Sequence, residues 1–369
     1  MSGNITKRGK NSWQIRFDAA PVADGKRQRR HVTVRGSYAD AKRELTRLLA
    51  ARDTGMLPSP TAATVGQYLQ SWLDTATGRS PKTLERYREL ARWQISPHLG
   101  DVPLQKLSPE MVRHWHAKLI DKVSALTTRH AHRLLRQVLA TAVKDGTLAR
   151  NVADVHKPPK VKRSEVEILT FEQIAAVQDA LQGHTLYPIV ALALGTGMRR
   201  GELLAIQWGD IDLDSATLQV KRSLEETSAG LRLKEPKSDA GWRTVTLSAA
   251  TVGMLRAHKI EQMQFRLAVG AGALKDDTLV FTDINGQPLK PHTVSRAWRR
   301  VVEAKDLPRV TFHSLRHTHA SVLIASGLDI LTISRRIGHA KPSVTLDVYG
   351  HLMGGADAAC AVAIGKILK

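Results

Sequence analysis

The chain has 369 residues, of which 42% are hydrophobic and 24% charged, and these proportions exclude a disordered protein. Its one cysteine excludes an intrachain disulfide and a thiolate metal cage, and the lack of any run of about 18 apolar residues excludes a membrane-spanning helix. Lysines and arginines number 55 against 34 aspartates and glutamates, and the formal net charge of +21 favours a polyanionic partner.

Nucleic acid is the expected polyanion, because the positive charge is spread over the whole chain. An anionic membrane surface would instead favour a polybasic tail or one basic amphipathic helix. The N-terminal stretch "MSGNITKRGKNSWQIRF" has no apolar core of a secretory signal. We therefore expect a cytoplasmic protein.

Residues 1–57 are predicted to form a small α+β domain, a three-stranded sheet plus a helix. "SWQIRF" (12–17) and "RHVTVR" (30–35) alternate apolar and polar residues with strand period, and a helical pattern follows the capping-box pair Ser37 and Asp40. This segment has 13 Lys and Arg against 5 Asp and Glu, a net charge of +8. The polar sheet face could enter a DNA groove or simply face solvent, and the segment alone leaves both readings open.

Residues 62–155 are predicted to form an all-α helical bundle after a proline-containing linker, residues 56–64. Four apolar stripes have helical spacing, and Ser80-Pro81 and Ser108-Pro109 are typical N-cap and first positions of the second and third helices. The arginines and histidines of "RHWHAK" and "TRHAHRLLRQ" suit phosphate contacts, although an ordinary solvated face explains each residue singly.

After a basic linker, residues 156–165, a third domain is predicted over residues 165–369. Thr170 and Gln173 form a capping-box pattern, and short strands are predicted in "TLQVKR", "LRLKEPK" and "RTVTLS". Helical patterns occupy most of the remainder. The expected fold is mainly α with a small antiparallel sheet.

Histidines crowd together at His313, His317 and His319. Ser314 stands where a zinc-binding His-Glu-x-x-His motif has glutamate, so the pattern disfavours zinc. The aspartates of "GDIDLD" (209–214) have the pattern of a turn rather than of a two-metal nuclease. No cofactor is expected.

Four stretches of the third domain carry the remaining candidates for chemistry: "GTGMRRGELLAIQW" (195–208), "LKEPKSDAGWRTVTL" (233–247), "HSLRHTHASVL" (313–323) and "IGHAKPSVTLDVYGH" (337–351). They supply two arginines, a lysine, two histidines and a tyrosine, which suit transfer at a phosphodiester without metal. Guanidinium groups match the phosphate oxygens, tyrosine can attack phosphorus, and lysine or histidine can move protons. In so basic a chain, spacing alone does not establish such a set.

In this order, "TGMRRGELLAIQWGDID", "HSLRHTHAS" and "IGHAKPSVTLDVYGH" resemble the signature boxes of the tyrosine recombinases, the phage-integrase family. The resemblance is strongest over residues 165–355. The helical domain before it resembles the family's core-site-binding domain, and residues 1–57 resemble its arm-site-binding domain. The resemblance implies a site-specific DNA recombinase of a bacterial host that integrates and excises a mobile element or prophage.

The resemblance also assigns roles in the first two boxes. Arg199 matches the first catalytic arginine, with Arg200 as the neighbouring alternative and Glu202 as a supporting acidic position. Lys237 matches the catalytic lysine of the β-hairpin, with Lys234 as the nearby alternative.

The last two boxes supply the other positions. His313 and Arg316 match the His-x-x-Arg box, which places them on one face if the segment is helical. His339 matches the later histidine or tryptophan position, and Tyr349 matches the nucleophile. His317 is expected to be a structural neighbour of the second arginine rather than a catalytic group.

The implied mechanism needs neither metal nor ATP, because a covalent link keeps the energy of the broken bond. Tyr349 attacks a DNA phosphodiester, forms a 3′-phosphotyrosyl link and releases a 5′-hydroxyl, and the 5′-hydroxyl of a partner strand then reseals the DNA. Arg199 and Arg316 clamp the phosphate oxygens, the two catalytic histidines assist them, and Lys237 protonates the leaving oxygen. Which group takes the tyrosine proton is left open.

The implied partners are double-stranded DNA attachment sites bound by a homotetramer, with a DNA-bending protein and an excisionase as candidate helpers and no membrane. The segment after Tyr349 could pack on a neighbouring subunit or close its own domain. Two alternatives remain: a type IB topoisomerase-like strand transferase, which shares the chemistry, and a non-catalytic DNA-binding protein that has kept the fold. The two preceding DNA-binding domains favour recombination over the first, and the full catalytic set favours an enzyme over the second.

Overall fold

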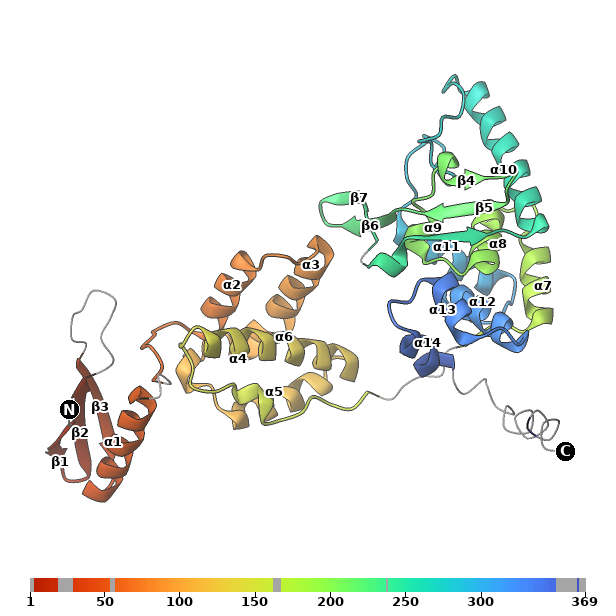
Figure 1. Cartoon of the computed structure of the whole chain (residues 1–369). Coiled ribbons are helices and arrows are strands. Elements are labelled where there is room, and N and C mark those ends of the chain that lie inside the picture. The colour runs from red at the N-terminus through yellow and green to blue at the C-terminus, as the bar shows by residue number, and fades with distance from the viewer. Residues whose placement is uncertain are drawn as a thin grey trace. The chain divides into compact units, whose positions relative to one another are not determined.

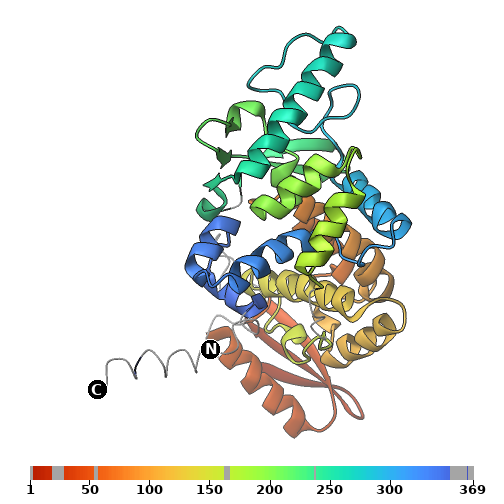
Figure 2. The same cartoon turned by 90° about the vertical axis from the view of Figure 1, so that its right-hand side faces the viewer.

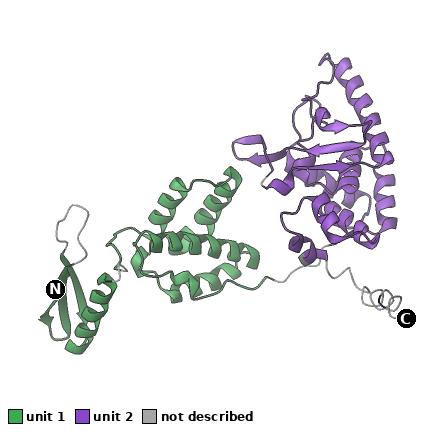
Figure 3. Cartoon of the chain, viewed as in Figure 1, with its two compact units in different colours: residues 1–163 green, residues 164–369 purple. Residues whose placement is uncertain are grey.

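A computed structural model describes residues 3–18, 29–53, 57–161, 167–236, 238–349 and residue 364. The chain divides into two compact units, residues 1–163 and residues 164–369 (Figure 3). Each unit is described by itself. Within the described ranges, no helix is both long and apolar enough to cross a membrane.

The N-terminal part of the first unit is a three-stranded antiparallel sheet with one helix, as predicted (Figure 1). Strands β1 (Asn4–Gly9), β2 (Ser12–Asp18) and β3 (Arg29–Arg35) lie in the order β1-β2-β3, and α1 (Tyr38–Asp53) packs on one face. Ile15 and Phe17 of β2 are buried there against Leu48 of α1. The opposite face carries the cross-strand row Asn4–Arg16–His31, so its side chains are polar and basic.

The rest of the first unit is the predicted helical bundle. Its main helices are α2 (Val65–Thr75), α3 (Pro81–Leu90), α5 (Pro109–Ile120) and α6 (Ala125–Lys144). The side chains of Ser80 and Ser108 cap α3 and α5, because each hydroxyl accepts a hydrogen bond from a first-turn N–H group. Trp115 is fully buried in the core, and its indole N–H donates to the Gln94 carbonyl.

The helix that begins at α3 continues through a wider π-helical turn, η1 (Ala91–Ile95), into the short α4 (Ser96–Leu99). Pro97 lies just past this turn. Proline has no N–H group to donate to the carbonyl four residues earlier, and its ring clashes with that carbonyl in an α-helix. The wider turn accommodates the proline without ending the helix.

The second unit is mainly helical with two small sheets. Its helices are α7 (Phe171–Ala180), α8 (Tyr187–Thr196), α9 (Arg200–Leu203), α10 (Ala249–Ala268), α11 (Pro291–Ala304), α12 (Ser314–Ala325), α13 (Ile330–Ile337) and α14 (Pro342–Tyr349). One antiparallel sheet has the order β4 (Ile211–Asp212), β5 (Thr217–Val220), β8 (Arg243–Thr246), and β6 (Ser223–Thr227) pairs with β7 (Gly230–Lys234). This architecture agrees with the sequence prediction.

The core of the second unit has two parts. The larger cluster surrounds α8, and Val190, Leu315 and Trp298 are fully buried in it. The smaller cluster joins α12, α13 and α14, which lie side by side in both views (Figures 1 and 2). Tyr349, at the end of α14, is buried in this smaller cluster against Ile333 of α13. The packing of α14 therefore determines where the tyrosine lies.

Candidate active site

Two helix ends bring the first arginine into the site. Helix α8 ends at Gly197, whose φ of 65° is left-handed, and a Cβ there would lie 2.5 Å from the His319 ring. Arg199 follows as the N-cap residue of α9. Its Nη1 donates to Glu202 Oε1 at 2.8 Å, and its Nη2 donates to the Gly338 carbonyl at 2.8 Å. The guanidinium is thus fixed from both sides.

Glu202 is a buried carboxylate, 4% exposed, that also binds a second arginine. Arg243, the first residue of β8, donates from Nη2 to Glu202 Oε2 at 2.8 Å and from Nε to the Arg336 carbonyl at 2.8 Å. Burial raises the pKa of Glu202, but the hydrogen bond and charge of Arg243, aided by Arg199, outweigh burial and leave that pKa below its usual value. Glu202, the predicted supporting residue, thus contacts both Arg199 and Arg243, and Arg243 was not among the predicted residues.

Arg316 lies on α12 and is 3% exposed. Its Nη1 donates to the Gly197 carbonyl at 2.7 Å, whereas its buried Nη2 has no hydrogen-bond partner within the described ranges. Burial, with the nearby charge of Arg199, lowers the pKa of Arg316 to about 9, so the group stays protonated at neutral pH. A buried cation with an unused donor is costly in a folded protein and suits an incoming anion.

The two predicted catalytic histidines flank these arginines. His313 is the N-cap residue of α12, one turn before Arg316, so the segment is helical as the spacing required. His313 is exposed at the surface, but partial burial of its ring, followed by the charge of Arg316, lowers its pKa. His339 follows Gly338, which ends α13 with a left-handed φ of 71°, and its Nδ1 lies 2.8 Å from Thr345 Oγ1. Burial, then Arg316, lowers the pKa of His339 to about 4.

Tyr349 lies beside α12 of its own chain. Its Oη is 2.6 Å from Nδ1 of His317, and the two ring centroids are 5.6 Å apart. The side chain is almost fully buried, and burial raises its pKa to about 12, against an opposing effect of the Arg316 charge. His317 therefore contacts the phenol directly, a contact that its position beside the second arginine did not predict.

A hollow of about 1070 Å³ opens beside this cluster. Arg199 and His313 line it, together with Arg200, Arg296 and Arg299. Arg200, the neighbouring alternative to Arg199, donates to Ser295 Oγ of α11 instead of binding Glu202. Several cationic groups border this hollow, although Glu303 and apolar side chains also line it, and such groups attract the phosphates of a nucleic acid.

Not every predicted residue can be placed. Lys237 and the segment after Tyr349, apart from Ile364, lie outside the described residues. The alternative lysine, Lys234, is described: it ends β7 and forms an ion pair with Glu225, a buried carboxylate of β6. This ion pair links the two strands of the hairpin, β6 and β7.

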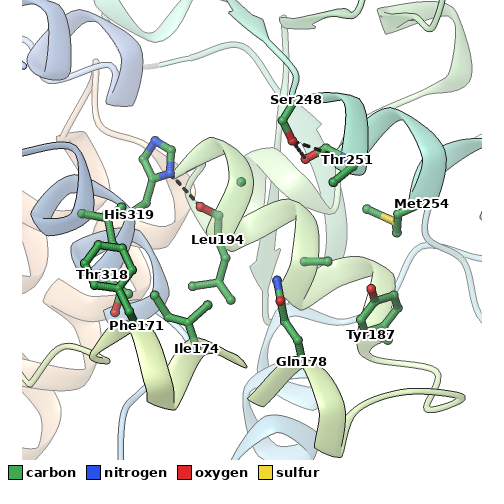
Figure 4. A pocket seen from close by; sticks show the side chains of 14 residues that line it. Phe171, Ile174, Gln178, Tyr187, Leu194, Ser248, Thr251, Met254, Thr318 and His319 are labelled. Carbon is green, nitrogen blue, oxygen red and sulfur yellow. Dashed lines mark hydrogen bonds between the residues drawn. The ribbon is translucent and has the colours of Figure 1, made fainter. Parts of the chain in front are cut away.

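A second hollow, of about 320 Å³, lies between α7, α8, α10 and α12 and has mainly apolar walls, including Phe171, Ile174 and Met254 (Figure 4). His319 reaches its edge, where Nδ1 lies 2.7 Å from the Leu194 carbonyl (Figure 4). Of the predicted catalytic residues that the structure describes, Arg199, His313, Arg316, His339 and Tyr349, none lines this hollow. The cationic cluster and the apolar hollow are therefore separate features.

The buried Tyr349 lies within reach of the charge of Arg316 on a mainly helical unit, and known families with this fold identify the class of enzyme. The model of the "Phage integrase family" matches residues 167–354, and that of the "Phage integrase, N-terminal SAM-like domain" matches residues 64–120. The chain belongs to the phage integrase family and is a tyrosine site-specific recombinase.

Individual relatives agree with this assignment. An integrase of Streptomyces ambofaciens is 30% identical over 339 residues, which cover 87% of this chain and 85% of that protein. A "Tyrosine recombinase XerC-like" protein of Caldanaerobacter subterraneus subsp. tengcongensis is 27% identical, with 95% of each chain covered.

Solved structures share the fold. The Tn1549 transposon integrase in complex with circular intermediate DNA has a TM-score of 0.71 at 21% identity, with 82% of this chain and 99% of that chain covered. A lambda integrase tetramer bound to a Holliday junction has a TM-score of 0.60 at 20% identity, with 94% of this chain and 95% of that chain covered. The second of these matches extends over most of both units.

Proposed function

We propose that Tyr349 is the nucleophile that cleaves and rejoins DNA through a 3′-phosphotyrosyl link. One observation carries this proposal: Tyr349 is packed against α12, where buried Arg316 presents an Nη2 group that no described residue binds. A phosphate oxygen placed on Arg316 would remove that unmet hydrogen bond and lie within electrostatic reach of the phenol.

The other predicted residues have complementary roles. Arg199 binds a second phosphate oxygen and is positioned by Glu202, which Arg243 holds in turn. Preorganised guanidinium groups stabilise the charge that builds on the phosphate in the transition state. His313 and His339 complete the hydrogen bonds to the phosphate. Lys237 protonates the leaving 5′-oxygen.

The remaining domains bind the rest of the DNA. Residues 62–155 bind the core site, and residues 1–57 bind an arm site with the polar face of the sheet, where Arg16 lies between Asn4 and His31. The bounds of both domains are taken from the sequence prediction. The working form is a homotetramer on two attachment sites, supported by the lambda integrase tetramer, and it integrates and excises a mobile element in a bacterial cytoplasm. A DNA-bending protein and an excisionase assist it.

The test is covalent trapping in EDTA. The full chain carrying Tyr349→Phe selects its core site from a pool of random duplexes, and the selected site is then made as a nicked duplex whose short 5′-hydroxyl fragment diffuses away after cleavage. Wild-type protein should become linked to the DNA 3′ end, and Tyr349→Phe should not.

Two results would contradict the proposal. One is a bound duplex that wild-type protein never modifies, and the other is an adduct of undiminished yield with Tyr349→Phe. A supercoiled plasmid distinguishes the topoisomerase alternative. Relaxation of a plasmid that lacks the selected site, without strand exchange between two sites, would favour that alternative.

A further inference from the structure

The contact between Tyr349 and His317 joins two residues 32 positions apart. Among the described residues, this is the hydrogen bond that the phenol oxygen makes, and the tyrosine is only 2% exposed. We propose that His317 accepts the proton of Tyr349 during strand cleavage and returns it during rejoining. His317 is then a catalytic residue. This inference rests on the proposed function of Tyr349.

The protonation state of His317 suits an acceptor. Burial, followed by the positive environment of His313 and Arg316, lowers the pKa of His317 to about 4. The imidazole is therefore neutral at pH 7. With its proton on Nε2, the Nδ1 lone pair points at the phenol, and the Tyr349 hydroxyl donates to it at 2.6 Å.

Tyr349 needs such a partner. Burial raises the phenol pKa to about 12, so only about one tyrosine in 10⁵ would be ionised at pH 7 without help. A neutral phenol is a weak nucleophile, and an adjacent base is one of the ways in which proteins activate it. A base at hydrogen-bond distance removes the proton as the bond to phosphorus forms.

A phosphate that binds at Arg316 should make His317 a stronger base. Before DNA binds, Arg316 disfavours a proton on His317, its neighbour along α12. A phosphate on Arg316 Nη2 brings negative charge beside both groups and so raises the affinity of the imidazole for a proton. His317 is thus neutral before DNA binds, and its basicity increases once the phosphate is bound.

The other two histidines are less well placed for this step. His313 meets His317 edge-on, with ring centroids 4.9 Å apart, and faces the cationic hollow. His339 Nδ1 is engaged with Thr345. Neither makes a described hydrogen bond to Tyr349, which leaves both free to act on the phosphate.

The step balances as follows. The Tyr349 oxygen forms a bond to phosphorus, its proton moves to Nδ1 of His317, the bond from phosphorus to the 5′-oxygen breaks, and Lys237 gives the leaving oxygen a proton. In rejoining, a 5′-hydroxyl loses its proton to Lys237 and attacks phosphorus. The phenolate leaves and recovers the proton from His317. No oxidant, reductant or metal is involved.

The experiment measures single-turnover adduct formation by the full chain on the nicked duplex, in EDTA, between pH 4 and pH 9, a range that reaches the pKa of His317. His317→Ala should slow the reaction about 10²- to 10⁴-fold, the usual contribution of a general base. It should also lose the decline of rate at low pH that protonation of His317 causes in the wild type. Added imidazole should restore part of the rate.

A second variant and a modified substrate distinguish a catalytic role of His317 from a positioning role. His317→Gln can still accept the phenol hydrogen bond but cannot take its proton, so it should remain slow. A duplex with sulfur in place of the bridging 5′-oxygen needs no acid for its leaving group, and it should not rescue His317→Ala. His319→Gln is the matched control, because His319 is also buried with a pKa of about 4 but contacts Leu194 instead of Tyr349. It should keep the wild-type pH profile.

Several outcomes would overturn the inference. A His317→Ala variant that is no slower than wild type, or is faster, would mean that the hydrogen bond only holds Tyr349 in an inactive position. Full activity of His317→Gln would reduce His317 to positioning, and rescue by the sulfur substrate would place it on the leaving group. Each of these requires a wild-type adduct that Tyr349→Phe abolishes, so each is distinct from failure of the proposed function.

Discussion

Arg243 and Arg199 bind opposite oxygens of one buried carboxylate, each at 2.8 Å from Glu202. Arg243 is 7% exposed at its side chain, whereas Arg199 is 42% exposed. The inner arginine therefore holds the carboxylate, and the carboxylate holds the outer arginine toward the cationic hollow. This relay makes Arg243 a positioning residue.

Arg243→Lys should weaken catalysis without removing a catalytic group. A lysine cannot bind Glu202 and the Arg336 carbonyl together as the guanidinium does. A hydrogen bond to a charged group contributes about 1.5–3 kcal/mol, so adduct formation should fall about 10- to 100-fold. Arg256→Lys is the matched control, because Arg256 pairs with Asp214 at the surface. Equal rates for the two variants would contradict the relay.

Gly338→Ala should destabilise the second unit and misplace His339. Its φ of 71° disfavours any Cβ, and an added Cβ would lie 2.8 Å from the Ala240 carbonyl. Gly327 has a similar φ of 78° with nothing within 4 Å, so Gly327→Ala isolates the backbone cost of about 1 kcal/mol. Unfolding in urea should show a larger loss of unfolding free energy for Gly338→Ala than for Gly327→Ala. A smaller loss would mean that the Ala240 carbonyl moves aside freely.

The helical bundle should lose stability in mild acid. His132 and His116 are both buried, with ring nitrogens 3.0 Å apart, and burial followed by His116 lowers the pKa of His132 to about 4. Between pH 6.5 and about 4 the unfolded chain therefore binds more protons than the folded one. The stabilisation is complete above pH 6.5 and is lost as the pH falls, by up to about 3 kcal/mol.

Hydrogen exchange of the α6 amides in the full chain checks this dependence on pH. His132→Asn keeps a polar atom near Nδ1 but cannot titrate, so protection in α6 should fall less between pH 6.5 and pH 4.5. His114→Asn, on the exposed face of α5, should behave as the wild type. An unchanged slope in His132→Asn would assign the acid sensitivity to other groups.

Arg16→Ala should separate arm binding from cleavage. Arg16 lies on the open face of the N-terminal sheet, opposite the face that α1 covers. If this face binds DNA, the affinity for a selected arm duplex should fall about 10-fold. If Arg16 contacts a phosphate, the slope of log affinity against log salt concentration should also fall by about 1. Adduct formation on the core duplex should persist. Arg43→Ala, on α1, provides the control, and equal affinities would exclude this face as the arm contact.

Local features of the fold could be predicted from the sequence because neighbouring residues determine them. Ser80 and Ser108 cap helices through N–H groups within the next turn, and the left-handed glycine at Gly338 precedes His339 directly. The spacing of His313 and Arg316 likewise needed only a helix. These signals span a few residues each.

Contacts between distant segments could not be read in the same way. His317 and Tyr349 meet only because α13 and α14 fold back onto α12, and Arg243 reaches Glu202 of helix α9 from strand β8. A single sequence offers no signal for either pair beyond the presence of an arginine and a histidine in the motif boxes. The π-helical turn before Pro97 could be predicted only in part. The proline indicates that the helix is disturbed there, but not that the disturbance is a π-helical turn.

Arg316 gives the unit an unusual thermodynamic character. A buried cation with one unmet donor weakens the folded protein, and in the proposed mechanism the group that binds this donor is a phosphate of the DNA backbone. The substrate therefore supplies a hydrogen-bond acceptor that the fold itself does not supply to Arg316. If Arg316 binds the phosphate as proposed, the catalytic unit is most stable while it is bound to the phosphodiester that it cleaves.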